Sequence, residues 1–235
     1  MADSSVNNVQ QLDLPLKIDL PAVKKLLRVH RANTRTEELA AELTEAVRAV
    51  ARPKAIYRQA HVGCAGNGTV EIDGIRFSSR ALSKNLAGRD TVFPYIATVG
   101  HEVDKIDIPR GDMWRQYCFD VIKTAVLVTS LDFLTEHLKE KYGIESVATM
   151  NPGEIADFPI EQQKPLFDLF GGAERQIGVT LTKGGAMHPT KSRSGIFFPN
   201  DTGFVTCRLC TQKRCPGRSA AYDPEVVREY LGTPA

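Results

Sequence analysis

The sequence predicts an α+β fold in which an antiparallel or mixed sheet is combined with a long central helix and flanking helices. Segments with helical and with alternating apolar patterns are interleaved along the chain, and several alternating segments follow one another closely, as in hairpins. One long, largely apolar helical segment runs from Gly111 to Tyr142. The hairpin-like strand pairs favour this class over a doubly wound parallel sheet.

Composition places the chain among ordinary globular proteins. Hydrophobic residues make up 42% of the 235 residues and charged residues 25%, which is typical of soluble domains with a sizeable core. The net charge of +2 is too small to indicate binding to nucleic acid or to a membrane surface. No apolar run reaches the roughly 18 residues of a membrane span. The polar start lacks the order of a signal peptide, so we expect a cytosolic location.

The first part of the chain is expected to contain a tail and two helices. Residues 1–18 begin with a polar stretch and are expected to form a flexible tail. A short amphipathic helix follows, with Asp19 near its cap and Pro21 in its first turn. A second helix runs from about Thr36 to Ala51, where Pro53 ends it.

The next stretch is expected to form strands. Residues 55–58 and 70–77 alternate as strands, and a glycine-rich turn over residues 63–68 joins them. A short helix from Ser78 to Leu86 comes next, followed by a buried apolar strand over residues 92–100. Within that strand Pro94 indicates either its beginning or an edge position, because proline cannot donate a ladder hydrogen bond.

The second half begins with the long helix. It is apolar nearly all round from Val121 to Leu134, which predicts a central core helix. The elements that follow are a helix over residues 160–170, strands over 177–181, 194–198 and 204–206, and a terminal helix over 224–231. We expect one α+β domain over residues 19–206, with a cysteine-rich segment over 207–235 packed on it.

Three of the five cysteines, Cys207, Cys210 and Cys215, form a Cys-x2-Cys-x4-Cys motif, called the cysteine cluster below. Such a cluster in a reducing compartment predicts a metal site and no disulfide framework. One loop of three cysteines with a remote ligand is more typical of an iron–sulfur cluster than of a zinc site, which usually pairs two knuckles. The surrounding basic residues would stabilise a negatively charged cluster; they are Arg208, Lys213, Arg214 and Arg218.

The fourth ligand is not evident from the spacing. Cys64 is the best candidate, because a glycine-rich turn exposes a thiol. Cys118 lies among apolar helix residues and is expected to be a small buried side chain. Zinc and uncoordinated thiols remain alternatives to iron–sulfur.

Two glycine-containing turns are candidates for binding a small molecule. The first turn is Met150-Asn151-Pro152-Gly153-Glu154, and Pro152-Gly153 is expected to precede a helix whose free N–H groups attract a carboxylate or phosphate. The second turn is Lys191-Ser192-Arg193-Ser194-Gly195, in which Lys191 offers a cation and Ser192 and Ser194 offer hydroxyls. Neither turn has a phosphate-loop pattern. On spacing alone, both turns are also compatible with ordinary connections.

The order and separation of these features resemble the activation domain of vitamin B12-dependent methionine synthase. Residues 151–156, 166–169, 177–182 and 186–198 are similar to its S-adenosylmethionine loop, Leu-Phe helix, Gly-x-x-Leu-Thr strand and Ser-x-Ser-Gly turn. This match covers roughly a fifth of the chain. The chain departs from the family pattern at Thr149, where the family has an arginine, and at Glu154, where it has a tyrosine.

The resemblance implies an S-adenosylmethionine site built on both turns. Lys191 would supply the cation in place of the family's arginine, and Asp132 on the long helix would contact the amino group of the cofactor. The full set implied in this way is Pro152, Gly153, Glu154, Ala156, Lys191, Ser192, Ser194, Gly195 and Asp132.

The function that the resemblance implies is reductive activation of a corrinoid protein. Cobalt(II) would be returned to an active state with S-adenosylmethionine as methyl donor and the iron–sulfur cluster as electron relay, on a corrinoid carried by a B12-dependent methyltransferase partner. Two alternatives stay open. One is a non-enzymatic iron–sulfur or zinc-bearing adaptor or chaperone that docks on the corrinoid protein, and the other is the same fold binding a different small molecule.

Overall fold

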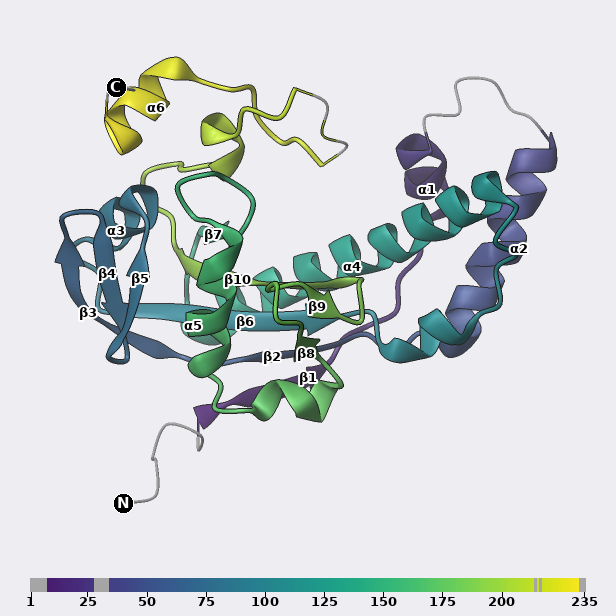
Figure 1. Ribbon diagram of the computed structural model, residues 1–235, viewed down its shortest axis with the longest axis horizontal. Helices are drawn as coiled ribbons and strands as arrows, with labels where there is room; N and C mark the ends of the chain where they lie inside the picture. The colour runs from purple at the N-terminus through teal and green to yellow at the C-terminus, as the bar shows by residue number, and fades with distance from the viewer. Residues whose placement is uncertain (1–7, 28–33, 214, 216, 233–235) are drawn as a thin grey trace.

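An antiparallel sheet of eight strands organises the computed structural model, which describes residues 8–27, 34–213, 215 and 217–232 (Figure 1). The strands are β1 (Gln10–Asp13), β2 (Lys54–Tyr57), β3 (Ala60–Gly66), β4 (Thr69–Ile72), β5 (Ile75–Ser78), β6 (Thr91–Thr98), β7 (Val147–Met150) and β10 (Ser192–Pro199). β6 is central: it pairs with β2 and β3 on one side and with β10 on the other, and β7 pairs with β10. The predicted α+β class with an antiparallel sheet is confirmed.

The helices lie around this sheet. They are α1 (Leu20–Leu26), α2 (Thr34–Val50), α3 (Arg80–Leu86), α4 (Met113–Tyr142), α5 (Gln163–Asp168) and α6 (Pro224–Leu231). Short 3-10 helices include η3 (Ile160–Gln162), η4 (Ala173–Ile177) and η5 (Thr206–Leu209). Strands β8 (Thr180–Leu181) and β9 (Met187–His188) form a small separate sheet. Among the described residues, no helix has the length and apolarity that a membrane crossing requires.

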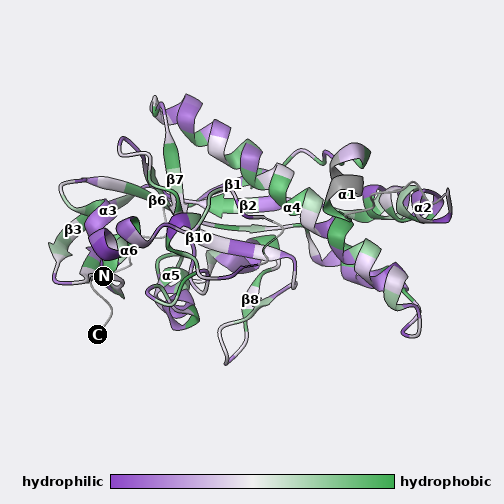
Figure 2. Ribbon diagram, turned by 90° about the horizontal axis from the view of Figure 1, so that it is seen from above, coloured by the Kyte–Doolittle hydropathy of each residue, from purple (hydrophilic) through white to green (hydrophobic). Residues whose placement is uncertain are grey.

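Helix α4 buries one face and not its whole circumference. Its first half packs with α1 and α2, and its second half covers a face of the sheet through Leu134 and Leu138. On the outer face Val128 is 45% exposed and Phe133 is 39% exposed. The expectation of an all-round core helix was therefore wrong, because no second layer formed by the described residues covers the outer side of α4 (Figure 2).

Two strands near the start of the chain were not expected. Residues 10–13 form the edge strand β1, with Gln11 paired to Ile56 of β2, where a flexible tail was expected. Residues 63–66, expected in a turn, belong to strand β3, and the turn itself lies at Asn67 and Gly68, which have positive φ angles. β1 is polar, and more than half of the residues of β3 are glycine or alanine. Neither strand therefore shows the alternating apolar pattern by which a strand is predicted from a sequence.

The remaining local differences are small. The single strand expected over residues 70–77 is the β4–β5 hairpin, which turns at Asp73 and Gly74. Only residues 180–181 of the expected strand 177–181 are extended, residues 204–206 form no strand, and β7 was missed.

Pro94 occupies an interior strand, contrary to the expectation of a strand start or an edge. It pairs with Ile196 of β10 on one side. On the other side it faces the junction between β2 and β3, where Arg58 N–H donates to its carbonyl oxygen at 3.1 Å. The missing N–H of proline therefore falls where one neighbouring strand ends and the next begins, so no regular ladder bond is lost.

The loop between β7 and α5 is tied to helix α3. Asp157 of this loop accepts hydrogen bonds from the Ser79 hydroxyl (2.5 Å), Arg80 N–H (3.1 Å) and Ala81 N–H (2.9 Å). The amides of Arg80 and Ala81 lie in the first turn of α3 and have no partner within the helix. A residue 76 to 78 positions away in sequence thus caps α3.

Substituting Asp157 with alanine should destabilise the protein by about 1–2 kcal/mol, because the first-turn amides of α3 lose their acceptor. The matched control is Asp168→Ala, at the exposed end of α5, where a change within about 0.5 kcal/mol is expected. The measurement is the free energy of unfolding in urea. Equal losses in both variants would contradict the capping role.

Candidate functional site

The two glycine-containing turns lie side by side, as a shared site requires. β7 ends at Met150, which pairs with Ile196 of β10, so the first turn leaves the sheet beside the start of β10. Chain connectivity then places residues 151–154 next to residues 193–195 (Figure 1). The second segment was expected to be a turn, but residues 192–195 belong to strand β10 and pair with β6, so that expectation was wrong. We keep the predicted names, first turn and second turn, for the two segments and call them together the paired turns.

Asn151 and Gly195 form the closest contact within the paired turns. The Asn151 side chain is 3% exposed, and its Oδ1 accepts hydrogen bonds from the Tyr95 hydroxyl (2.7 Å) and the Thr149 hydroxyl (3.2 Å). A Cβ atom on Gly195 would lie 1.9 Å from Asn151 Oδ1, so only glycine fits. The Tyr95 ring stacks on Phe197 with centroids 4.2 Å apart, and burial raises the pKa of Tyr95. Asn151 is thereby fixed by three strands.

The backbone of the first turn closes on itself. Gly153 has φ +87°, and its N–H donates to the Phe158 carbonyl at 2.8 Å. Glu154 N–H donates to the Asn151 carbonyl at 3.2 Å. The helical segment expected to follow Pro152-Gly153 begins at Ile160, as predicted. The amides of Gly153 and Glu154 are not free N–H groups of that helix, because they already have partners inside the loop.

Charged and polar side chains connect the paired turns to their surroundings. Arg193 of the second turn forms an ion pair with Glu154 of the first, and these side chains are 39% and 31% exposed. The Ser194 hydroxyl is buried and donates to Gln163 Oε1 at 2.5 Å. Ser192 donates to the Pro189 carbonyl at 2.7 Å. A cation and a carboxylate are thus paired and partly exposed, while the serine hydroxyls are hydrogen-bonded within the protein.

Lys191 and Asp132 do not face the first turn. Lys191 Nζ lies 2.9 Å from Asp120 Oδ2 of α4 and also donates to Thr124. Asp132 lines a different hollow of α4 together with Lys17, on the side where His137 contacts β2. Burial, followed by the neighbouring Glu136, raises the pKa of Asp132. The acidic residue that α4 presents toward the second turn is therefore Asp120, which sequence reasoning missed.

A cleft of about 480 Å³ separates the first turn from the C-terminal segment. Gly153, Glu154 and Ala156 line one wall, and Cys210, with Tyr222, lines the other. Pro152, which was predicted to bind the ligand, is buried and does not line this cleft. This cleft brings the glycine turn and the cysteine cluster to the same part of the molecule.

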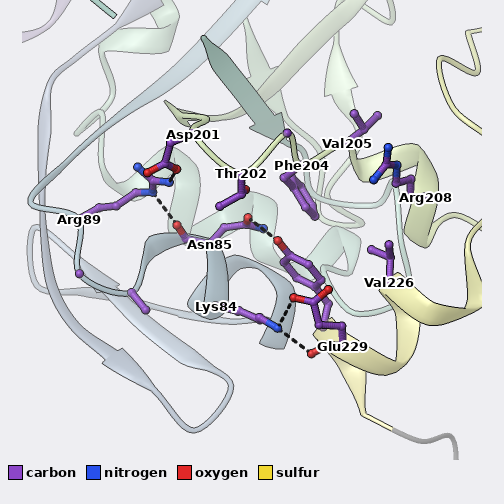
Figure 3. A pocket seen from close by; sticks show the side chains of 14 residues that line it. Lys84, Asn85, Arg89, Asp201, Thr202, Phe204, Val205, Arg208, Val226 and Glu229 are labelled. Carbon is purple, nitrogen blue, oxygen red and sulfur yellow. Dashed lines mark hydrogen bonds and ion pairs between the residues drawn. The ribbon is translucent and has the colours of Figure 1, made fainter. Parts of the chain in front are cut away.

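A second hollow, of about 380 Å³, lies between α3, the loop after β10 and α6 (Figure 3). Its rim carries the ion pairs Arg89–Asp201 and Lys84–Glu229, and its floor includes Phe204. We do not assign this hollow a ligand.

The cysteine cluster lies on η5 and the loop after it. Partial burial raises the pKa of Cys207, but hydrogen bonds from the Ser219 hydroxyl and amide and the nearby Arg218 charge outweigh it and hold the pKa below its usual value. The Arg218 guanidinium also donates to the carbonyl oxygens of Cys207 (3.2 Å) and Cys210 (3.1 Å). Of the predicted basic surroundings, the Arg218 charge contributes to the lowered pKa of Cys207, but less than the hydrogen bonds from Ser219 do.

The predicted ligands are not gathered into a preformed centre. Cys64 is exposed on strand β3, and Cys118 is buried in α4 as expected. In the parts of the chain that the structure describes, no three histidine, cysteine, aspartate or glutamate side chains are close enough together to hold a metal ion. The thiolates suit a soft metal chemically, but the metal site and its fourth ligand stay predictions.

Introducing a Cβ at position 195 should be costly. We expect Gly195→Ala to lower the free energy of unfolding by about 1–3 kcal/mol, since Asn151 must move away from its hydroxyl partners. The control is Gly184→Ala, where an added Cβ meets nothing within 4 Å. Urea denaturation of both variants tests this; a Gly195→Ala protein as stable as the control would refute the contact.

Metal analysis tests the cysteine cluster. Protein purified without oxygen should be brown and contain iron and labile sulfide, both lost in Cys210→Ser, because the cluster needs its thiolates. Cys118→Ala is the control and should retain the metal. Cys64→Ser should lower the iron content if Cys64 is the fourth ligand. Equimolar zinc without visible absorbance would rule out an iron–sulfur centre.

Comparison with known proteins identifies the fold. No protein-family model and no curated protein sequence matches this chain. A solved structure described as the MetH reactivation domain bound to AdoHcy is similar, with a TM-score of 0.59 and 13% sequence identity. The similarity covers 95% of this chain and 89% of that chain. The chain therefore has the fold of the MetH reactivation domain, which confirms the fold predicted from the two glycine turns.

Proposed function

We propose that the chain binds S-adenosylmethionine at the paired turns and takes part in reactivating a corrinoid protein. The observation that carries this proposal is the contact of the two turns, with Gly195 packed on Asn151, within a fold whose solved counterpart was bound to AdoHcy. AdoHcy is what remains of S-adenosylmethionine after methyl transfer. A chain that places both turns together on this fold has the framework for such a ligand.

The corrinoid is the substrate in this proposal and is carried by a partner protein. One electron from an external one-electron reductant, such as a reduced flavoprotein, takes its cobalt from the inactive +2 state to the +1 state, which is uphill. The reduced cobalt then takes the methyl group from the sulfonium of S-adenosylmethionine, leaving AdoHcy, and this second step makes the sequence favourable. The cobalt supplies the redox chemistry, and the protein supplies position.

The residues of this chain would bind and orient the methyl donor. Tyr95 and Thr149 hold Asn151, and Asn151 in turn fixes the second turn at Gly195. Residues held this firmly before binding lose little entropy when a ligand arrives. Arg193 and Glu154 offer the charges on the rim.

The cysteine cluster enters the proposal only as a ligand set. Cys207, Cys210 and Cys215 would provide thiolates for an iron–sulfur cluster, whose contribution when bound would be electron transfer. Among the described residues, these thiols do not form a gathered metal centre. What the chain itself provides is a loop held by Arg218 through backbone carbonyls.

One observation favours an alternative, the non-enzymatic adaptor. Thr149 stands where the family pattern has an arginine, so this position beside the first turn lacks a cation. A protein that keeps the fold without binding the methyl donor would dock on the corrinoid protein as a chaperone or electron-transfer adaptor. Titration with S-adenosylmethionine separates the two functions, because only the first requires binding of this ligand.

Calorimetric titration with S-adenosylmethionine should show saturable binding that is weakened at least about tenfold in Gly153→Trp. The substitution is disruptive because φ is +87° and a Cβ would lie 3.1 Å from Ile160 Cδ1. Gly184→Trp, in an open turn, is the control and should bind like the wild type. A flat titration of the wild-type protein would favour the adaptor, or a different ligand.

A further inference from the structure

We propose that Glu154 and Arg193 form an exchangeable clamp for the α-amino-acid end of the S-adenosyl ligand, Arg193 taking its carboxylate and Glu154 its ammonium group. This inference rests on the proposed function and names the residues that would read the charged end of the ligand. Its basis is the ion pair that bridges the paired turns.

The clamp has the correct charges in an accessible place. An α-amino acid carries a carboxylate and an ammonium group on one carbon, so its recognition needs a cation and an anion close together. Arg193 and Glu154 are in contact and come from different turns. With exposed fractions of 39% and 31%, both side chains can be reached from solvent without unfolding either turn.

Arg193 replaces a charge that position 149 lacks. Thr149 is neutral, and its hydroxyl is engaged with Asn151 Oδ1 at 3.2 Å. Arg193, Gly195 and Phe197 alternate on one face of the sheet, and Phe197 pairs with Thr149 of β7, so Arg193 and Thr149 lie on the same face. The ion pair with Glu154 holds the Arg193 charge at the first turn.

Lys191 cannot take this role without breaking other contacts. Its ammonium group lies 2.9 Å from Asp120 Oδ2 and 3.0 Å from Thr124 Oγ1, both on α4. The Arg193–Glu154 pair needs no such loss, since the ligand replaces both partners at once. One half-exposed ion pair, which contributes little to stability, is exchanged for two ion pairs with the ligand, one of them with the fork geometry that arginine offers a carboxylate.

The test compares three ligands by calorimetry. AdoHcy has the complete amino-acid end, its decarboxylated analogue keeps only the amine, and 5′-methylthioadenosine has neither group. Arg193→Gln should weaken AdoHcy binding about 10- to 100-fold, the range for a lost hydrogen bond to a charged group, and leave the other two ligands unchanged. Glu154→Gln should weaken both amine-bearing ligands and leave 5′-methylthioadenosine unchanged.

Arg89→Gln is the matched control, because Arg89 also forms an ion pair between separate elements, with Asp201, and lies away from the paired turns. It should bind all three ligands like the wild type. Arg193→Lys, which keeps the charge, should recover part of the AdoHcy affinity. Thermal unfolding of each variant confirms that it folds.

The outcomes separate the clamp from the function on which it rests. Suppose that the wild-type protein binds AdoHcy and that Arg193→Gln weakens the affinity for all three ligands equally, or for none. The clamp is then wrong, and the S-adenosyl site remains. A wild-type protein that binds none of the three ligands overturns both. Loss confined to the ligand with a carboxylate establishes Arg193 as the residue that recognises it.

Discussion

The contact between Asn151 and Gly195 is the constraint on which the rest of the site depends. It lets β7 and β10 come together at their ends, and it places a buried amide side chain where three strands can hold it. The amide nitrogen of Asn151 has no hydrogen-bond partner among the described residues. An unpaired buried donor is unfavourable by itself, so the tight packing around the oxygen side must offset that cost. The turns are consequently rigid before any ligand arrives.

Much of the fold could be predicted from the sequence where side-chain pattern and chain geometry agree. The terminal helix, predicted over 224–231, has these bounds in the structure, because Asp223 caps it and Pro224 begins it. β1 and β3 could not be predicted, since pairing with β2 and β4 makes them strands while their own side chains carry no alternation. The position of Pro94 depends on a break between two other strands, which no local pattern reveals.

The candidate site was predictable in its backbone and not in its contacts. Glycines at 153 and 195 carry a geometric requirement, which a sequence displays directly. The partners of charged side chains are set by elements far apart in the chain, so the pairing of Lys191 with Asp120 could not be predicted. The cysteine cluster is a third case. Its spacing indicates ligands, but the structure brings no three potential ligands of the described chain together.

The tie between Asp157 and helix α3 connects the loop after β7 thermodynamically to the first turn of a neighbouring helix. When the loop opens, the first-turn amides of α3 lose Asp157 as their acceptor, so opening of the loop is coupled to fraying of the helix. Anything that holds the loop shut therefore slows hydrogen exchange at the α3 amides, although they lie outside the cleft. The first turn of α3 would thus act as a built-in reporter of occupancy, read without a label on the ligand.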